Sequence, residues 1–169
     1  MPVNISTQHT FPNLSCSELY DTLTNKDILQ ARYENIGVRN VNFIEFDETD
    51  GQYTIESTRE IYADLPKLLR KFANEWNFVT QKDIWRKQSD GTFLGLSTVH
   101  IQAELPIEFT GTLHIRPDAN GCTNHIDMQA SCPVRIVGKI AEQFIKGKSL
   151  ESMNDEYTAL VDILNKHDR

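Results

Sequence analysis

One stretch near the end of the sequence constrains the fold more than any other. From residue 133 onward, apolar or small residues recur at steps of three and four, the spacing of one face of an α-helix. A helix spanning roughly Val134 to Lys166 would be about 50 Å long, at about 1.5 Å per residue. Its apolar face must be covered, and we expect the strands that precede it to supply the surface. The face consists of Val137, Ile140, Phe144, Gly147, Leu150, Met153, Tyr157, Leu160 and Leu164.

The chain before this helix mostly alternates apolar and polar residues with the period of two that is typical of β-strands. Turn sequences divide it into hairpins, at Asp50-Gly51, at Ser89-Asp90-Gly91 and at Asp118-Ala119-Asn120-Gly121. Strands joined by tight turns are antiparallel. The sequence therefore predicts an α+β fold, a seven-stranded antiparallel sheet with a long C-terminal helix, in one domain over residues 1–169. The predicted strands are 5–11, 41–46, 53–62, 78–87, 93–104, 107–116 and 122–131.

Three shorter helices are predicted from capping signals. Ser15 and Glu18 have the spacing of a capping box, and Asn25 is suited to cap a second helix that ends at Gly37. Asp64-Leu65-Pro66 predicts a third helix from Lys67 to Trp76. Its expected buried side carries Leu65, Leu68, Leu69 and Phe72.

Composition excludes several classes of partner. A formal net charge of −7 argues against nucleic acid binding, and we interpret the one basic cluster, Lys67, Arg70 and Lys71, as a solvated helix face. The three cysteines have no C-x-x-C spacing, which indicates neither a disulfide framework nor a zinc site. The sequence has no secretory signal pattern and no run long enough to span a bilayer. We expect a cytoplasmic protein without cofactor or metal, either a monomer or a weak homodimer.

Several short motifs resemble one superfamily across nearly the whole chain. They are Ser57-Thr58-Arg59-Glu60 running into Asp64-Leu65-Pro66, then Trp85-Arg86, Asp90-Gly91, and Val137-Gly138-Lys139-Ile140. This set resembles the START-like, birch-pollen-allergen-like (SRPBCC) superfamily, and more narrowly the bacterial group catalogued as domain of unknown function 2505. The resemblance implies a helix-grip fold, in which a curved sheet wraps around the C-terminal helix and two short helices follow the first strand. It also implies binding of a hydrophobic ligand.

Alternation assigns the face of the sheet that the helix covers. That face is apolar but includes small residues such as Gly95, Ser97, Gly111 and Ala130, which indicate either sheet curvature or unfilled volume beneath the helix. If the volume is unfilled, a leucine at position 111 should fit. A three-residue loop at Ser89-Asp90-Gly91 would place Trp85 opposite Gly95, covering the gap left by the glycine.

The same alternation turns Ser57 and Arg59 inward. A buried arginine needs a partner, so Arg59 either pairs with a carboxylate such as Glu45, sits at the rim, or anchors the carboxylate or phosphate of a ligand. The candidate ligand-binding residues combine this face with the helix. They are Ser57, Arg59, Trp85, Gly95, Ser97, Phe109, Gly111, Leu113, Met128, Phe144, Met153 and Tyr157.

No motif in the sequence identifies a reaction. It contains no Gly-x-Ser-x-Gly, no His-Glu-x-x-His and no glycine-rich phosphate loop. A four-residue loop at 118–121 would place His114 opposite His125, on the polar outer face, where we expect no metal. The leading hypothesis is a binding module for a lipid or polyketide-like molecule. The alternatives are a protein-interaction domain or a cyclase- or hydrolase-type enzyme using Arg59, Glu45, Tyr53 or Tyr157.

Overall fold

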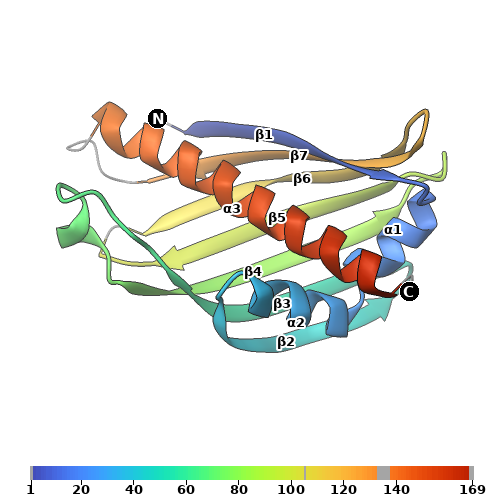
Figure 1. Ribbon diagram of the computed structural model, residues 1–169, viewed down its shortest axis with the longest axis horizontal. Coiled ribbons are helices and arrows are strands. Elements are labelled where there is room, and N and C mark those ends of the chain that lie inside the picture. Colours follow the sequence, from blue (N-terminus) through green and yellow to red (C-terminus); the bar gives the residue numbers. More distant parts are fainter. Residues whose placement is uncertain (1, 105, 133–137, 168–169) are drawn as a thin grey trace.

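The computed structural model describes residues 2–104, 106–132 and 138–167 (Figure 1). Two short helices follow the first strand, and a long helix follows the last. A single 3-10 turn, η1 (Arg70–Phe72), interrupts the strands. In chain order the other elements are β1 (Val3–Pro12), α1 (Cys16–Leu23), α2 (Lys26–Asn35), β2 (Arg39–Thr49), β3 (Gln52–Tyr62), β4 (Trp76–Lys87), β5 (Phe93–Gln102), β6 (Ile107–Pro117), β7 (Gly121–Ser131) and α3 (Gly138–His167).

The strands of the described residues form one seven-stranded antiparallel sheet in the order β1-β7-β6-β5-β4-β3-β2. Six consecutive strands make a meander, and the first strand pairs with the last. Helix α3 crosses one face of the sheet diagonally, with α2 beside its C-terminal half (Figure 1). This face is called the inner face below. The predicted α+β architecture is confirmed.

The predicted hairpin turns and helix caps form as the local sequence dictates. Asp50 and Gly51 are the two turn residues between β2 and β3, both with positive φ (54° and 74°), which is the type I′ geometry of tight hairpins. Ser15 Oγ accepts a hydrogen bond from the Glu18 N–H at 3.1 Å, and Asn25 Oδ1 accepts one from the Ile28 N–H at 3.1 Å. These local signals therefore set where the elements begin and end.

The helix predicted for residues 67–76 is wrong. Only the turn η1 forms there, and Leu68 of the expected buried side is 51% exposed. Pairing between β3 and β4 extends into this segment instead. The Ala63 N–H donates to the Glu75 carbonyl at 2.8 Å, so the end of the segment lies beside the residue that follows β3. The Asn77 side chain then bonds both the N–H and the carbonyl of Asn74, closing the loop. Pairing of distant segments has overridden a local helical pattern.

Helix α3 is confirmed, but its buried face is only partly as predicted. Tyr157, Leu160 and Leu164 pack on the core, whereas Ile140 is 54% exposed and Gly147 is also exposed. From Ile140 to Leu164 the predicted face repeats every ~3.4 residues, less than the about 3.6 residues of a helical turn, so it drifts by roughly a third of a turn over this span. Val137 lies outside the described residues.

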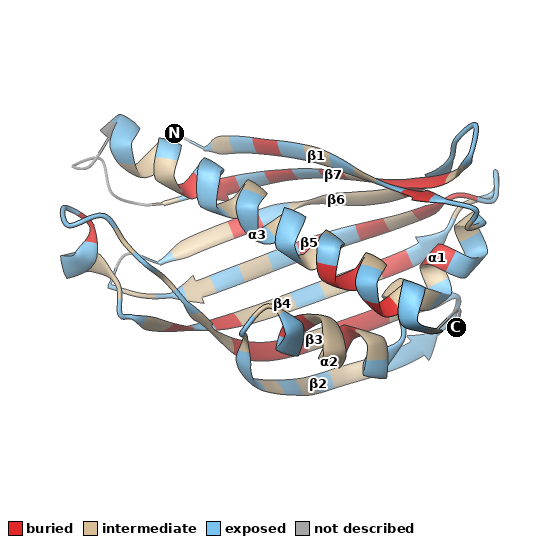
Figure 2. Ribbon diagram, viewed as in Figure 1, coloured by how far each residue is buried: buried red, intermediate tan, exposed pale blue. Residues whose placement is uncertain are grey.

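Two clusters of buried apolar side chains fix α3 to the sheet, and Figure 2 shows these buried positions on the strands and on turns of α3. The first cluster lies toward α1 and α2 and includes Leu160 of α3. The second cluster includes Ile145 of α3. The buried members of the first are Phe11, Leu19, Leu29, Tyr33, Ile55, Trp85, Phe93, Ile115, Cys122 and Leu160; those of the second are Ile5, Phe109, Ile126, Met128, Ala130 and Ile145.

Candidate functional site

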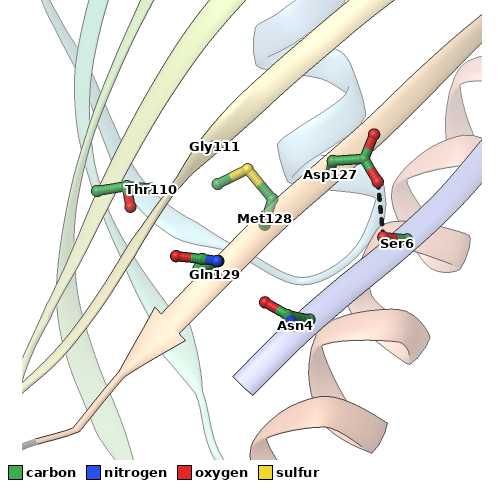
Figure 3. A pocket seen from close by; sticks show the side chains of 7 residues that line it. All are labelled: Asn4, Ser6, Thr110, Gly111, Asp127, Met128 and Gln129. Atoms are coloured by element: carbon green, nitrogen blue, oxygen red, sulfur yellow. Dashed lines mark hydrogen bonds between the residues drawn. The ribbon is translucent and has the colours of Figure 1, made fainter. Parts of the chain in front are cut away.

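A shallow hollow of about 460 Å³ lies on the outer side of β1, β7 and β6 (Figure 3). Its polar side chains are exposed, and its one carboxylate, that of Asp127, already accepts a hydrogen bond from Ser6 Oγ at 2.6 Å. Nothing in the hollow demands a ligand, so we place the candidate site on the inner face instead. The hollow is lined by Asn4, Ser6, Thr110, Gly111, Asp127, Met128 and Gln129.

Gly111 is required by close contact between backbones rather than by open space. A Cβ atom at this position would overlap the carbonyl oxygen of Asp127 and lie 2.7 Å from both Cα and Sδ of Met128. The expectation that a leucine would fit at position 111 is therefore wrong, whether or not a ligand space exists. The glycine instead permits the close approach of β6 and β7.

Trp85 occupies the space that its partner glycine leaves. Its side chain is only 2% exposed, and the register pairs it with Gly95, as the predicted three-residue loop requires. A Cβ at position 95 would lie 2.9 Å from two atoms of the indole ring. Trp85 thus faces inward as part of the core, and this part of the inner face is filled.

The register brings the predicted inner-face residues side by side. Ser57, Ser97, Phe109 and Met128 are buried, and Leu113 is half-buried. On α3, Met153 packs on the second cluster and Tyr157 on the first, while half-buried Phe144 belongs to neither. The predicted site residues therefore do not form one group: half of them belong to the two clusters that hold the helix.

A polar group interrupts the inner face on the adjacent strands β3, β4 and β5. It consists of Ser57, Arg59, Gln81, Asp83 and Ser97 and is called the inner polar group below. Ser97 Oγ donates to Asp83 Oδ1 at 2.5 Å, and Gln81 Nε2 donates to Asp83 Oδ2 at 2.9 Å. Burial raises the pKa of Asp83, against the opposing effects of these two hydrogen bonds and of Arg32 and Arg59.

Arg59 lies beside this carboxylate without forming an ion pair with it. The Arg59 side chain is 7% exposed, and its guanidinium lies 4.6 Å from the ring centroid of Tyr33 on α2. Arg32 packs over the same ring at 5.5 Å, and its Nη2 is 3.9 Å from Glu156 Oε2 on α3. Within the described residues, Arg59 Nη1 and Arg32 Nε are buried without a hydrogen-bond partner, and one of the three alternatives for Arg59, an ion pair with Glu45, is absent.

Sequence reasoning found two members of the inner polar group on β3, Ser57 and Arg59, and Ser97 on β5. It missed Gln81 and Asp83, although these lie at steps of two residues between Val79 and Trp85 in β4 and so share their face of the sheet. It also missed Arg32, because no local pattern indicates that α2 lies over β3. The alternation in β4 was the one available signal, since two polar residues on a buried face are unusual.

Residues 6–164 match the model of a family whose description is "Protein of unknown function (DUF2505)". The chain belongs to this family. No curated protein matches the sequence. The solved structures that are similar in fold to this DUF2505 chain include the following three. Human STARD10 gives a TM-score of 0.63 at 12% identity, over 98% of this chain and 66% of that chain. A STAR-related lipid transfer protein from Xanthomonas axonopodis gives a TM-score of 0.58 at 14% identity, over 92% of this chain and 82% of that chain. Ara h 8.0201 gives a TM-score of 0.56 at 10% identity, over 96% of this chain and 99% of that chain.

These similarities show that the DUF2505 chain has the helix-grip fold of START-like, birch-pollen-allergen-like proteins. The identities are low, so they carry the fold and no residue roles. None of the helices in the described part of the chain combines the length and apolar character needed to cross a bilayer.

Two further polar residues that the sequence singled out in the DUF2505 chain, His114 and Tyr157, have structural contacts. The predicted register of His114 opposite His125 is confirmed, and His114 Nε2 lies 3.1 Å from Thr92 Oγ1. No three His, Cys, Asp or Glu side chains converge within residues 2–104, 106–132 and 138–167. Tyr157 anchors α3 to β1, because its hydroxyl donates to the Thr10 carbonyl at 2.7 Å and its ring stacks on His9 at 4.6 Å.

Proposed function

We propose that this chain binds a small hydrophobic or amphipathic ligand, such as a lipid or polyketide-like molecule, between the inner face of the sheet and α3. The observation that carries the proposal is the inner polar group, a few convergent polar side chains on an otherwise apolar covered face. Ligand sites are typically built in this way. The fold of the STAR-related lipid transfer protein is consistent with such a ligand.

Partial exposure of inner-face side chains supports the same location. Gln81 and Asp83 are only half-buried, and so are the apolar Val99, Ile101 and Leu113, although all five lie on the face that α3 crosses. Apolar side chains that remain partly wet on a covered face gain free energy when a ligand displaces the water, at about 25 cal/mol per Å². The inner face near β4 and β5 therefore favours an apolar occupant.

A matched pair of substitutions tests the location. Val99→Phe adds bulk on the inner face, and Thr98→Phe adds the same bulk at the neighbouring, exposed outer position. We expect Val99→Phe to weaken binding of dodecanol or a polarity-sensitive dye by about tenfold, and Thr98→Phe to leave the affinity within about twofold. Equal affinities for the two variants would contradict binding under α3. Extraction and mass analysis of compounds that accompany the protein from its native host would identify the ligand class.

Asp83 favours a second candidate, an enzyme that uses the same space. A half-buried carboxyl whose pKa is raised by burial is suited to donate or accept a proton. Asp83→Asn should then abolish conversion of a co-purified compound while leaving its binding intact. Mass analysis of that compound before and after incubation would detect turnover, and an unchanged compound would favour the binding module.

A further inference from the structure

Two buried hydrogen-bond donors lie unpartnered at the junction of α2 and β3. They are Nη1 of Arg59 and Nε of Arg32, each without a hydrogen-bond partner within the described residues. Arginine remains charged at any physiological pH and carries donors only. A buried guanidinium with an unmet N–H is costly unless an acceptor completes it. The structure therefore specifies the missing group as an acceptor.

The two guanidiniums also pack against the same aromatic ring. Both pack over the Tyr33 ring, at 4.6 Å for Arg59 and 5.5 Å for Arg32, so their central carbons are at most about 10 Å apart. Tyr33 is 2% exposed and holds the pair on a rigid, apolar support. Two like charges at this separation repel each other, and an anion between them would relieve the repulsion.

Neighbouring carboxylates do not already fill this role. Both oxygens of Asp83 accept hydrogen bonds from Ser97 and Gln81, and Asp83 forms no ion pair with Arg59 within the described residues. Glu156 is at a loose 3.9 Å from Arg32 Nη2. The third unpartnered buried atom, Asn124 Oδ1, is an acceptor on β7, which is separated from β3 by β6, β5 and β4. Both unmet groups near Tyr33 are thus donors.

We infer that Arg59 and Arg32 form an anion site for the acidic head of an amphipathic ligand, a carboxylate or a phosphate monoester. This inference rests on the proposed function, because the tail of such a ligand would lie along the half-buried apolar side chains Val99, Ile101 and Leu113. The planar fork of arginine suits both acidic heads, since each offers two oxygens to parallel N–H donors.

Binding of three probes with one tail tests the inference. Dodecanoate, dodecyl phosphate and dodecanol share an alkyl chain and differ in the head group. We expect calorimetry to show one or both acids binding the wild type about tenfold or more tightly than dodecanol, the effect of a charge-assisted hydrogen bond. The stronger of the two acids identifies the head group.

Substitutions then assign the preference to the site. Arg59→Gln should abolish the preference for the acids over dodecanol, and Arg32→Gln should reduce that preference. Arg59→Lys, which keeps the charge but loses the fork, should retain only part of it. Arg86→Gln is the matched control, because Arg86 is exposed on the other face of β4. It should keep the full preference.

Each contrary result separates the anion site from the proposed function. Equal binding of the acids and dodecanol by the wild type, or an undiminished preference in Arg59→Gln and Arg32→Gln, would overturn the anion site and leave the binding function standing. Failure of all three probes to bind would overturn both. Inorganic phosphate that binds in an Arg59-dependent manner while dodecanol does not bind would support the anion site and overturn the hydrophobic ligand.

Discussion

Replacing Gly111 by alanine tests the close approach of β6 and β7. Gly111 pairs with Met128, and a Cβ atom at position 111 would overlap the Asp127 carbonyl oxygen and lie 2.7 Å from Met128 Cα. Both are backbone atoms of β7, a strand paired on its other side with β1. The clash cannot be relieved by a side-chain rotation, so the two strands must separate or twist locally.

The expected loss of stability follows from this geometry. Overpacking a dense interior typically costs about 1 to 3 kcal/mol, and displaced backbone places the variant at the upper end. We expect Gly111→Ala to lower the free energy of unfolding by about 3 kcal/mol. For a chain of this length, a loss of that size lowers the melting temperature by roughly 6 to 12 °C.

Gly147→Ala is the matched control. Gly147 is exposed in α3, and a Cβ there meets no atom within 4 Å, so alanine should raise stability by about 1 kcal/mol through helix propensity. Urea unfolding and thermal melts of both variants provide the measurement. A Gly111→Ala protein as stable as the wild type would refute the packing argument, because no other relief of the backbone overlap is available.

Two further predictions concern ionisable groups. Because burial raises the pKa of Asp83, the folded state keeps this proton to a higher pH than the unfolded chain, so its stabilising effect is lost as pH rises through the raised pKa. The melting temperature of Asp83→Asn, relative to that of the wild type at the same pH, should therefore rise from acid to neutral pH. Asp127→Asn, at an exposed position, is the control. A difference in melting temperature between Asp83→Asn and wild type that does not change with pH would contradict this prediction. On the outer face, thermal melts of His125→Gln should stay within about 0.5 kcal/mol of wild type, whereas His114→Gln should cost about 1 kcal/mol through its contact with Thr92. Stabilisation of the wild type by added Zn²⁺ that both substitutions abolish would reverse the expectation of no metal.

Local chemistry made most of the elements predictable. The turn at Asp50-Gly51, the caps at Ser15 and Asn25, and the loop that sets Trp85 opposite Gly95 each depend on residues a few positions apart. Such features follow from backbone preference and short-range hydrogen bonds. The failed helix at residues 67–76 shows the limit, because the β3–β4 ladder decided that segment from outside it.

The candidate site was predictable only in part, because it joins elements far apart in the chain. Alternation within β3 was enough to turn Ser57 and Arg59 inward. The contact between Arg59 and the Tyr33 ring could not be predicted from alternation, because Tyr33 belongs to α2 and the contact depends on how that helix packs on the sheet. Glu45 was a carboxylate that the sequence suggested as a partner, but it lies opposite Glu56 in the β2–β3 ladder and forms no pair with Arg59 in the described residues.

The stability of Arg59 variants decides whether its charge serves the fold or a ligand. Removing one side chain of a buried ion pair lowers the free energy of unfolding by about 3 to 5 kcal/mol, because the other charge is left buried without a partner. An arginine in such a pair is therefore needed for folding. Arg59 has no such partner in the described residues, and its contact with the Tyr33 ring contributes about 1 to 2 kcal/mol at most. Arg59→Met removes that contact together with an unmet donor, so the two effects offset each other. Without ligand, the variant should unfold within about 1 kcal/mol of wild type in urea, whereas Trp85→Ala, which empties a filled core position, should lose about 3 to 5 kcal/mol. A loss in Arg59→Met as large as that in Trp85→Ala would mean that the arginine holds the fold together, and the anion site would then have no unmet donor to explain.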